Sequence, residues 1–146
     1  MVDFSEDYAD VLTAVQEGEF EIVQEIINAR IVPVNTLDQS GCSLLHWAAI
    51  NNRVIIARLL IENGLSKALP GGVLGETPLQ WALRKKYYNM MEVIYKNTQC
   101  DLSSKSVQGN DALFLACKLC TYSLLVLYFI TLTDSIMYNL VVEQVM

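Results

Sequence analysis

Histidine is almost absent from this chain, and that absence excludes most catalytic and metal-binding functions. Among 146 residues only His46 carries an imidazole, and the four cysteines are scattered: Cys42, Cys100, Cys117 and Cys120. A structural zinc site needs four ligands at suitable spacing, and a catalytic triad needs a nucleophile beside a base. Neither is easily built around a lone histidine. The sequence therefore predicts no metal site, no cofactor and no enzymatic activity.

Basic residues are also scarce. Ten lysines and arginines stand against 16 acidic residues, which gives a net charge of −6. This balance argues against a nucleic-acid-binding surface. Eight of the acidic residues precede the first basic one, Arg30, and we interpret them as a solvated cap at the N-terminal end rather than an acidic docking motif. Residues 1–10 lack the basic start and apolar core of a secretory signal, so a cytoplasmic chain with reduced thiols is expected.

A period of 34 residues is the strongest signal that is present. Residues 45–49, Leu-His-Trp-Ala-Ala, return as Leu-Gln-Trp-Ala-Leu at 79–83 and as Leu-Phe-Leu-Ala-Cys at 113–117. The glycines Gly41, Gly75 and Gly109 keep the same step. A fixed period of this length indicates one supersecondary unit stacked on copies of itself. We predict an all-α solenoid of about four helix-turn-helix units, at about 5–37, 38–71, 72–105 and 106–133, the last degenerate.

Each unit contains signals for the start of a helix. Ser43, Thr77 and Asp111 share one phase of the period, where a side-chain oxygen can accept a hydrogen bond from the first free helix amides. Pro78 then occupies a first helical position, and Gln80 completes a capping-box pattern. These residues predict a short inner helix in each unit.

An outer helix is expected to follow each inner one. Its apolar pairs fall in register: Ile22-Val23, Ile56-Ala57, Met90-Met91 and Leu124-Leu125. The next apolar residues come three or four positions later, which is the helical period. Between the helices of the third unit, residues 84–86 (Arg-Lys-Lys) are predicted to form a solvated turn.

These patterns resemble those of the ankyrin repeat family, whose unit of about 33 residues starts a helix with Thr-Pro-Leu-His-x-Ala. Residues 41–49 and 75–82 carry the match. A narrower likeness, through residues 44–53 and 71–82, is to the N-terminal ankyrin region of DHHC-type palmitoyltransferases of the huntingtin-interacting and yeast Akr kinds. The resemblance implies ankyrin repeats over residues 1–118, a chain truncated before any catalytic domain, and a location in the cytoplasm or on the cytoplasmic face of a Golgi or other endomembrane.

Trp47 and Trp81 are the candidate functional residues. They share one phase of adjacent inner helices, so their side chains should be neighbours, because packed helices lie about 8–10 Å apart. Two interpretations stay open. The rings pack only on neighbouring repeats, or they form a groove whose aromatic faces suit proline and whose indole N–H groups bind a partner's carbonyl. The palmitoyltransferase resemblance implies that Trp81 and Asn51 help to hold proline-containing segments. Leu115 takes the same phase in the fourth unit, where the groove should end.

Two further predictions concern structural side chains. In ankyrin repeats the histidine at the position of His46 bonds to backbone groups and ties neighbouring turns together, and Gln80 can mimic part of that bonding in the next unit. Residues 117–120 have the Cys-x-x-Cys form but lack two further zinc ligands and a thioredoxin-like context. We expect both of these cysteines to be buried in an inner helix.

The C-terminal segment, residues 119–146, departs from the pattern. Its apolar run from 119 to 133 is about 15 residues, shorter than the roughly 20 that cross a bilayer. An apolar C-terminal helix is predicted, because a helix that is apolar all round is buried or lies in lipid. We prefer a repeat packed against another surface, or a chain cut short whose ending does not belong to a mature repeat; membrane association through residues 119–145 is the alternative.

Two functional hypotheses result. The first is a non-catalytic module that binds a short linear, proline-containing segment of a partner protein on its concave face. The second is the substrate-recruiting arm of a protein-cysteine S-palmitoyltransferase without its DHHC domain. No Asp-His-His-Cys motif occurs in the 146 residues, and a cysteine nucleophile needs a base or a depressed pKa. This stretch of chain is therefore not expected to transfer an acyl group.

Overall fold

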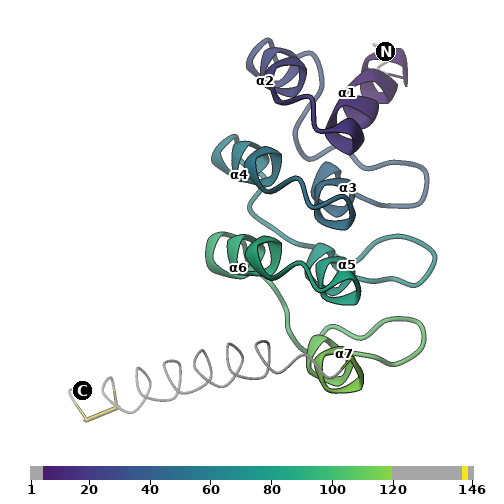
Figure 1. Cartoon of the computed structure of the whole chain (residues 1–146), viewed down its shortest axis with the longest axis vertical. Coiled ribbons are helices and arrows are strands. Elements are labelled where there is room, and N and C mark those ends of the chain that lie inside the picture. The colour runs from purple at the N-terminus through teal and green to yellow at the C-terminus, as the bar shows by residue number, and fades with distance from the viewer. Residues whose placement is uncertain (1–4, 120–142, 145–146) are drawn as a thin grey trace.

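A computed structural model describes residues 5–119 and 143–144 and shows a stack of helix pairs. The helices run over α1 (Ser5–Glu17), α2 (Phe20–Asn28), α3 (Leu44–Ile50), α4 (Val54–Glu62), α5 (Pro78–Lys85), α6 (Tyr88–Asn97) and α7 (Ala112–Lys118). The odd-numbered helices form an inner column and α2, α4 and α6 form an outer one (Figure 1). The all-α solenoid predicted from the 34-residue period is confirmed.

The inner helices begin at the predicted caps. Ser43 Oγ accepts a hydrogen bond from the His46 amide, Thr77 Oγ1 from the Gln80 amide, and Asp111 Oδ1 from an amide of α7. Each cap satisfies one of the helix amides that has no intrahelical acceptor. Caps of this kind were readable from the sequence because they depend only on neighbours in the chain.

A left-handed residue joins each inner helix to its outer helix. Gly18, Asn52 and Lys86 lie 34 residues apart and have φ angles of +83°, +57° and +59°. A positive φ reverses the chain within one or two residues, which brings the outer helix back along the inner one. The pairing of helices therefore depends on a backbone conformation that glycine adopts freely, that asparagine tolerates and that costs lysine about 1 kcal/mol.

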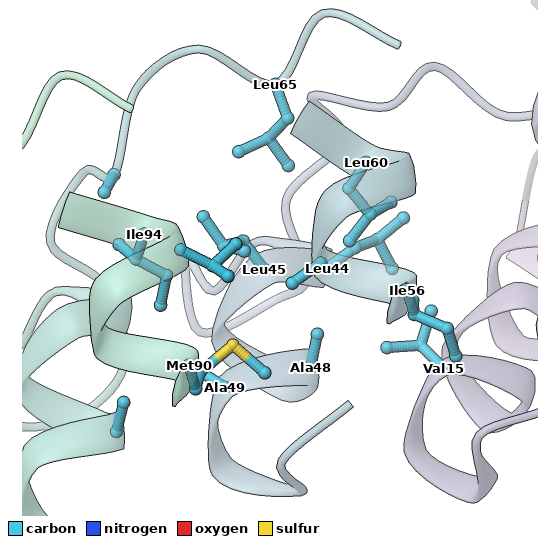
Figure 2. Packing of buried hydrophobic residues seen from close by; sticks show 14 of the residues in the cluster. Val15, Leu44, Leu45, Ala48, Ala49, Ile56, Leu60, Leu65, Met90 and Ile94 are labelled. Carbon is cyan, nitrogen blue, oxygen red and sulfur yellow. The ribbon is translucent and has the colours of Figure 1, made fainter. Parts of the chain in front are cut away.

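The core lies between the two columns (Figure 2). Leu44 and Leu45 of α3, Leu60 of α4, and Met90 and Ile94 of α6 are all almost completely buried. Burying an aliphatic side chain of this size contributes about 2 kcal/mol. Leu60, Met90 and Ile94 belong to the apolar sets that the helical period identified in the outer helices, so this part of the core follows from the sequence pattern.

The first outer helix departs from the predicted apolar pairs. Val23 of α2 is buried, but its neighbour Ile22 is exposed. Helix α2 packs on α1 and α4, and among the described residues no earlier outer helix covers its remaining side. The acidic side chains that face solvent along α1 and α2 agree with a solvated N-terminal cap.

Long loops connect each outer helix to the next inner helix, and they project from the inner column (Figure 1). Successive loops are joined by hydrogen bonds: the Gly72 amide donates to the Ser40 carbonyl at 3.0 Å, and the Val107 amide donates to the Leu74 carbonyl at 2.8 Å. The loops and the inner helices together frame one continuous face of the stack.

The predicted apolar C-terminal helix, including the outer helix of the fourth unit, falls on residues outside those described. Within 5–119 and 143–144, each helix is too short or too polar to cross a lipid bilayer. The membrane alternative for residues 119–145 therefore stays a prediction.

Candidate functional site

Trp47 and Trp81 meet where α3 packs on α5. Their ring centroids are 5.5 Å apart with an interplanar angle of 86°, an edge-to-face arrangement. Aromatic pairs at this separation favour offset or edge-to-face geometry, which contributes about 1 kcal/mol beyond burial. Both side chains are only partly buried. The prediction that the two indoles are neighbours is confirmed, and each ring still has a surface that another molecule can contact.

A pocket of about 440 Å³ opens beside the two rings, and we call it the Trp47–Trp81 pocket. The inner helices supply one wall and the connecting loops the other; its residues are Ser40, Cys42, Trp47, Ile50, Gly72, Val73, Leu74, Glu76, Trp81 and Arg84. The walls are mainly apolar, and the volume lies in the range of small-molecule and peptide side-chain sites. The pocket can therefore accept a few apolar groups of a bound chain.

The two indole N–H groups are not equivalent. Trp47 Nε1 donates to Asp38 Oδ2 at 3.0 Å, while Asp38 Oδ1 accepts from the amides of Ser40 and Cys42. The indole N–H of Trp47 is therefore already bonded within the chain, and binding of a partner's carbonyl by this group stays a prediction. Trp81 Nε1 has no hydrogen-bond partner among the described residues, because the position equivalent to Asp38 in the next unit is a glycine. Only the N–H of Trp81 is available to a ligand.

Asn51 lies beside the pocket rather than in its wall. It follows the last residue of α3, and its Nδ2 donates to the Trp47 carbonyl at 2.9 Å. Its Oδ1 has no partner within the part of the chain that the structure describes, and the side chain is partly exposed. The structure therefore brings Trp47 and Trp81 together and places Asn51 one helical turn after Trp47.

An ion pair that the sequence did not predict lies at the edge of the pocket. Arg84 Nε donates to Glu76 Oε1 at 3.0 Å and to Oε2 at 2.9 Å, and Nη2 also donates to Oε1. The Glu76 side chain is 2% exposed and that of Arg84 is 36% exposed. The predicted turn is wrong for Arg84 and Lys85, because both belong to α5; only Lys86, at the helix C-cap, lies in the turn. The sequence did contain one indication that Arg84 lies near the pocket: it follows Trp81 by three residues, and residues at this spacing share a helix face.

His46 joins two units of the stack. Its Nε2–H donates to the Glu76 carbonyl at 2.8 Å, and its Nδ1 lies 3.1 Å from the Ser43 amide, which donates to it. One donor and one acceptor describe the neutral imidazole. Burial lowers the pKa of His46 below its ordinary value of 6.5. The predicted structural role of the only histidine is confirmed.

Gln80 makes the equivalent bonds one unit later. Its Oε1 accepts from the Thr77 amide at 2.8 Å, and its Nε2 donates to the carbonyls of Ser104 and Asn110, each at 3.1 Å. A glutamine amide presents an acceptor and a donor much as a neutral imidazole does, but it has no proton to gain near neutral pH. The prediction that Gln80 mimics the bonding of His46 is confirmed. A His46→Gln variant should therefore keep these hydrogen bonds while removing the group that can take up a proton.

Acidification is expected to destabilise the chain through His46. The unfolded imidazole takes up a proton below about pH 6.5, whereas the folded one resists protonation because its pKa is lowered. The free energy of unfolding should therefore fall as the pH drops from 7.5 to 5.5, measured by urea denaturation at each pH. His46→Gln should lose less over this interval. An equal loss in the variant would assign the pH dependence to other groups.

The three cysteines in the described part of the chain show no reactive arrangement. Cys42 is a buried residue in the wall of the pocket, and burial raises the pKa of its thiol to about 11, which disfavours the thiolate nucleophile. Cys117 is exposed, so the prediction of a buried thiol is wrong for this residue: α7 packs through Ala112, Leu115 and Ala116, and Cys117 falls on another side. Cys120 lies outside the described residues. Groups of three or more potential metal ligands are not found in the described part of the chain.

Comparison with known proteins supplies the family context. A family model described as ankyrin repeats, in three copies, matches residues 11–106. Palmitoyltransferase AKR1 of Debaryomyces hansenii is 36% identical over 110 residues, which cover 73% of this chain and 13% of that protein.

Two vertebrate proteins show the same likeness. Palmitoyltransferase ZDHHC17 of Danio rerio is 39% identical over 93 residues, 62% of this chain and 15% of that protein. Palmitoyltransferase ZDHHC13 of Homo sapiens is 38% identical over 88 residues, 60% of this chain and 14% of that protein. The chain thus spans no more than 15% of the length of these curated relatives.

Proposed function

This chain belongs to the ankyrin repeat family, and from that premise we propose that it is a non-catalytic module that binds a linear, proline-containing segment of a partner protein. The segment lies along the face formed by the inner helices and the connecting loops. Repeat proteins of this kind act through extended surfaces made by neighbouring units. The proposal assigns no bond-making chemistry to the residues of this chain.

The observation that carries the proposal is the Trp47–Trp81 pocket. Two aromatic rings and the aliphatic side chains of Ile50, Val73 and Leu74 suit the ring of a proline, which is flat and apolar. A proline-rich segment is also preorganised, with carbonyl groups that make no internal hydrogen bonds. The free N–H of Trp81 supports binding of one such carbonyl. The Oδ1 of Asn51 supports binding of an N–H further along the segment.

A second candidate function follows from the similarity to three proteins named palmitoyltransferases. In this version the bound segment belongs to a substrate of such an enzyme, and the module recruits it at the cytoplasmic face of an endomembrane. The 146 residues contain no Asp-His-His-Cys motif. Acyl transfer is therefore not assigned to any residue described above.

Trp81→Ala is expected to weaken the binding of a proline-containing peptide at least tenfold. A buried aromatic contact at the centre of an interface is worth about 2 kcal/mol, and this change also removes the free N–H. The measurement is the fluorescence anisotropy of a labelled Val-x-x-Gln-Pro peptide titrated with each protein. Because Trp47 would be the only remaining tryptophan, quenching of its emission reports the same binding independently.

Tyr88→Ala is the matched control. Tyr88 is an exposed aromatic residue on the outer helix α6 and does not line the pocket. Its removal should leave peptide affinity unchanged, and circular dichroism should show both variants to be folded. Equal affinities of the wild type and Trp81→Ala would reduce the tryptophan pair to a packing contact.

A further inference from the structure

We propose that Arg84 is the specificity-determining residue of the Trp47–Trp81 pocket. Its guanidinium donates to a neutral carbonyl oxygen of the bound segment, and the buried Glu76 makes the pocket discriminate against an acidic side chain at that place. The inference rests on the proposed function and adds to it a rule for which segments bind.

The geometry places the guanidinium beside the aromatic rings. Arg84 follows Trp81 by three residues on α5, and both side chains line the pocket. The Glu76 carboxylate accepts hydrogen bonds from the Nε–H and from one N–H of Nη2 of Arg84. An arginine has five N–H donors, so three remain, and they have no other acceptor within the described residues. Because the side chain is 36% exposed, a ligand in the pocket can reach them.

The ion pair is better explained by orientation than by stability. Glu76 is 2% exposed, and the attraction to its partner repays only in part the cost of removing a carboxylate from water. An apolar pair of similar size would stabilise the fold at least as well. What the two-oxygen contact supplies is a fixed direction for the planar guanidinium. A lysine at this position would be a point charge and could not make the two-oxygen contact that fixes the direction of the guanidinium.

Local charge selects the chemistry of the acceptor. Glu76 lines the pocket and already neutralises the guanidinium of Arg84. A carboxylate on the ligand would meet the negative charge of Glu76, in a chain whose net charge is −6. A main-chain or amide carbonyl accepts the same hydrogen bond without this repulsion. The pocket thereby rejects one class of segment by an unfavourable contact.

Two labelled peptides test the rule. They share a Val-x-x-X-Pro sequence, in which X is glutamine in one peptide and glutamate in the other. The wild-type chain should bind the glutamine peptide about tenfold more tightly than the glutamate peptide, since a hydrogen bond to a charged donor is replaced by repulsion. In Glu76→Gln the ratio of the two affinities should fall to about one or invert, because the guanidinium is no longer neutralised.

A double variant and a charge-matched control complete the experiment. Arg84→Met combined with Glu76→Gln leaves no unpaired buried charge, so it should fold, and it should bind the glutamine peptide about tenfold more weakly. Glu92→Gln removes an equal charge from the exposed face of α6 and should keep the wild-type ratio.

The outcomes separate the two levels of the proposal. A double variant that binds the glutamine peptide as tightly as the wild type, or a Glu76→Gln ratio equal to that of Glu92→Gln, would overturn the role of Arg84 while leaving the peptide site intact. Failure of the wild-type chain to bind either peptide would overturn the proposed function and this inference with it.

Discussion

Replacing Gly71 by alanine is expected to lower the free energy of unfolding by about 3 kcal/mol. A Cβ atom at this position would lie 2.3 Å from the carbonyl oxygen of Gly41 and 2.9 Å from its carbonyl carbon. Both are backbone atoms of the preceding loop, so no side-chain rotation can relieve the overlap. The two loops would have to separate, and the neighbouring hydrogen bond between Gly72 and Ser40 would be lost with them.

Gly109→Ala is the control for this prediction. Gly109 has a φ of +78° and open space around its missing Cβ, whereas Gly71 does not have a positive φ. The control therefore carries only the cost of a left-handed alanine, about 1 kcal/mol. Urea denaturation of both variants gives the comparison. If Gly71→Ala costs no more than Gly109→Ala, close packing of the loops does not contribute to stability.

Leu45→Ala is expected to cost about 3 kcal/mol, because it removes a completely buried side chain and leaves a cavity in a close-packed core. Leu45 lies in the cluster that joins α3 to the residues of α6, including Met90 and Ile94 (Figure 2). Since each unit of a repeat protein depends on contacts with its neighbours, damage in the second unit weakens its coupling to the first and the third. The change in midpoint on urea denaturation measures the loss.

Ile55→Ala provides the matched comparison for Leu45. Ile55 is on the neighbouring helix α4 and is 67% exposed, so its truncation should change stability by less than about 0.5 kcal/mol. The same aliphatic truncation then differs only in burial. Similar costs at the two positions would mean that the α3–α6 cluster is not the main source of stability.

Much of the candidate site could be predicted from the repeat. Trp47 and Trp81 share a phase, and stacked copies of one unit bring equal phases together, so their contact needed no coordinates. The roles of His46 and Gln80 were also accessible, since each bonds to the cap three residues before it. Contacts within one helix, or between identical positions of successive units, could thus be predicted from the sequence.

Other features depend on contacts that have no sequence period. Asp38 accepts a hydrogen bond from the indole N–H of Trp47, whereas a glycine at the equivalent place leaves the N–H of Trp81 without a partner among the described residues. Nothing in the pattern indicated that Glu76 would be buried against Arg84. The exposure of Cys117 likewise follows from the side on which α7 meets α5.

The sequence by itself determined the stack: a unit repeated every 34 residues, its caps, its apolar helix faces and the pairing of the two indoles. Such features depend on the local geometry of the chain and on the repetition of one structural unit along the stack. Only the tertiary structure decided which N–H is free, which carboxylate is buried and where the pocket opens. Those depend on how the connecting loops pack against the inner helices, and that packing is set by single side chains in which the copies differ.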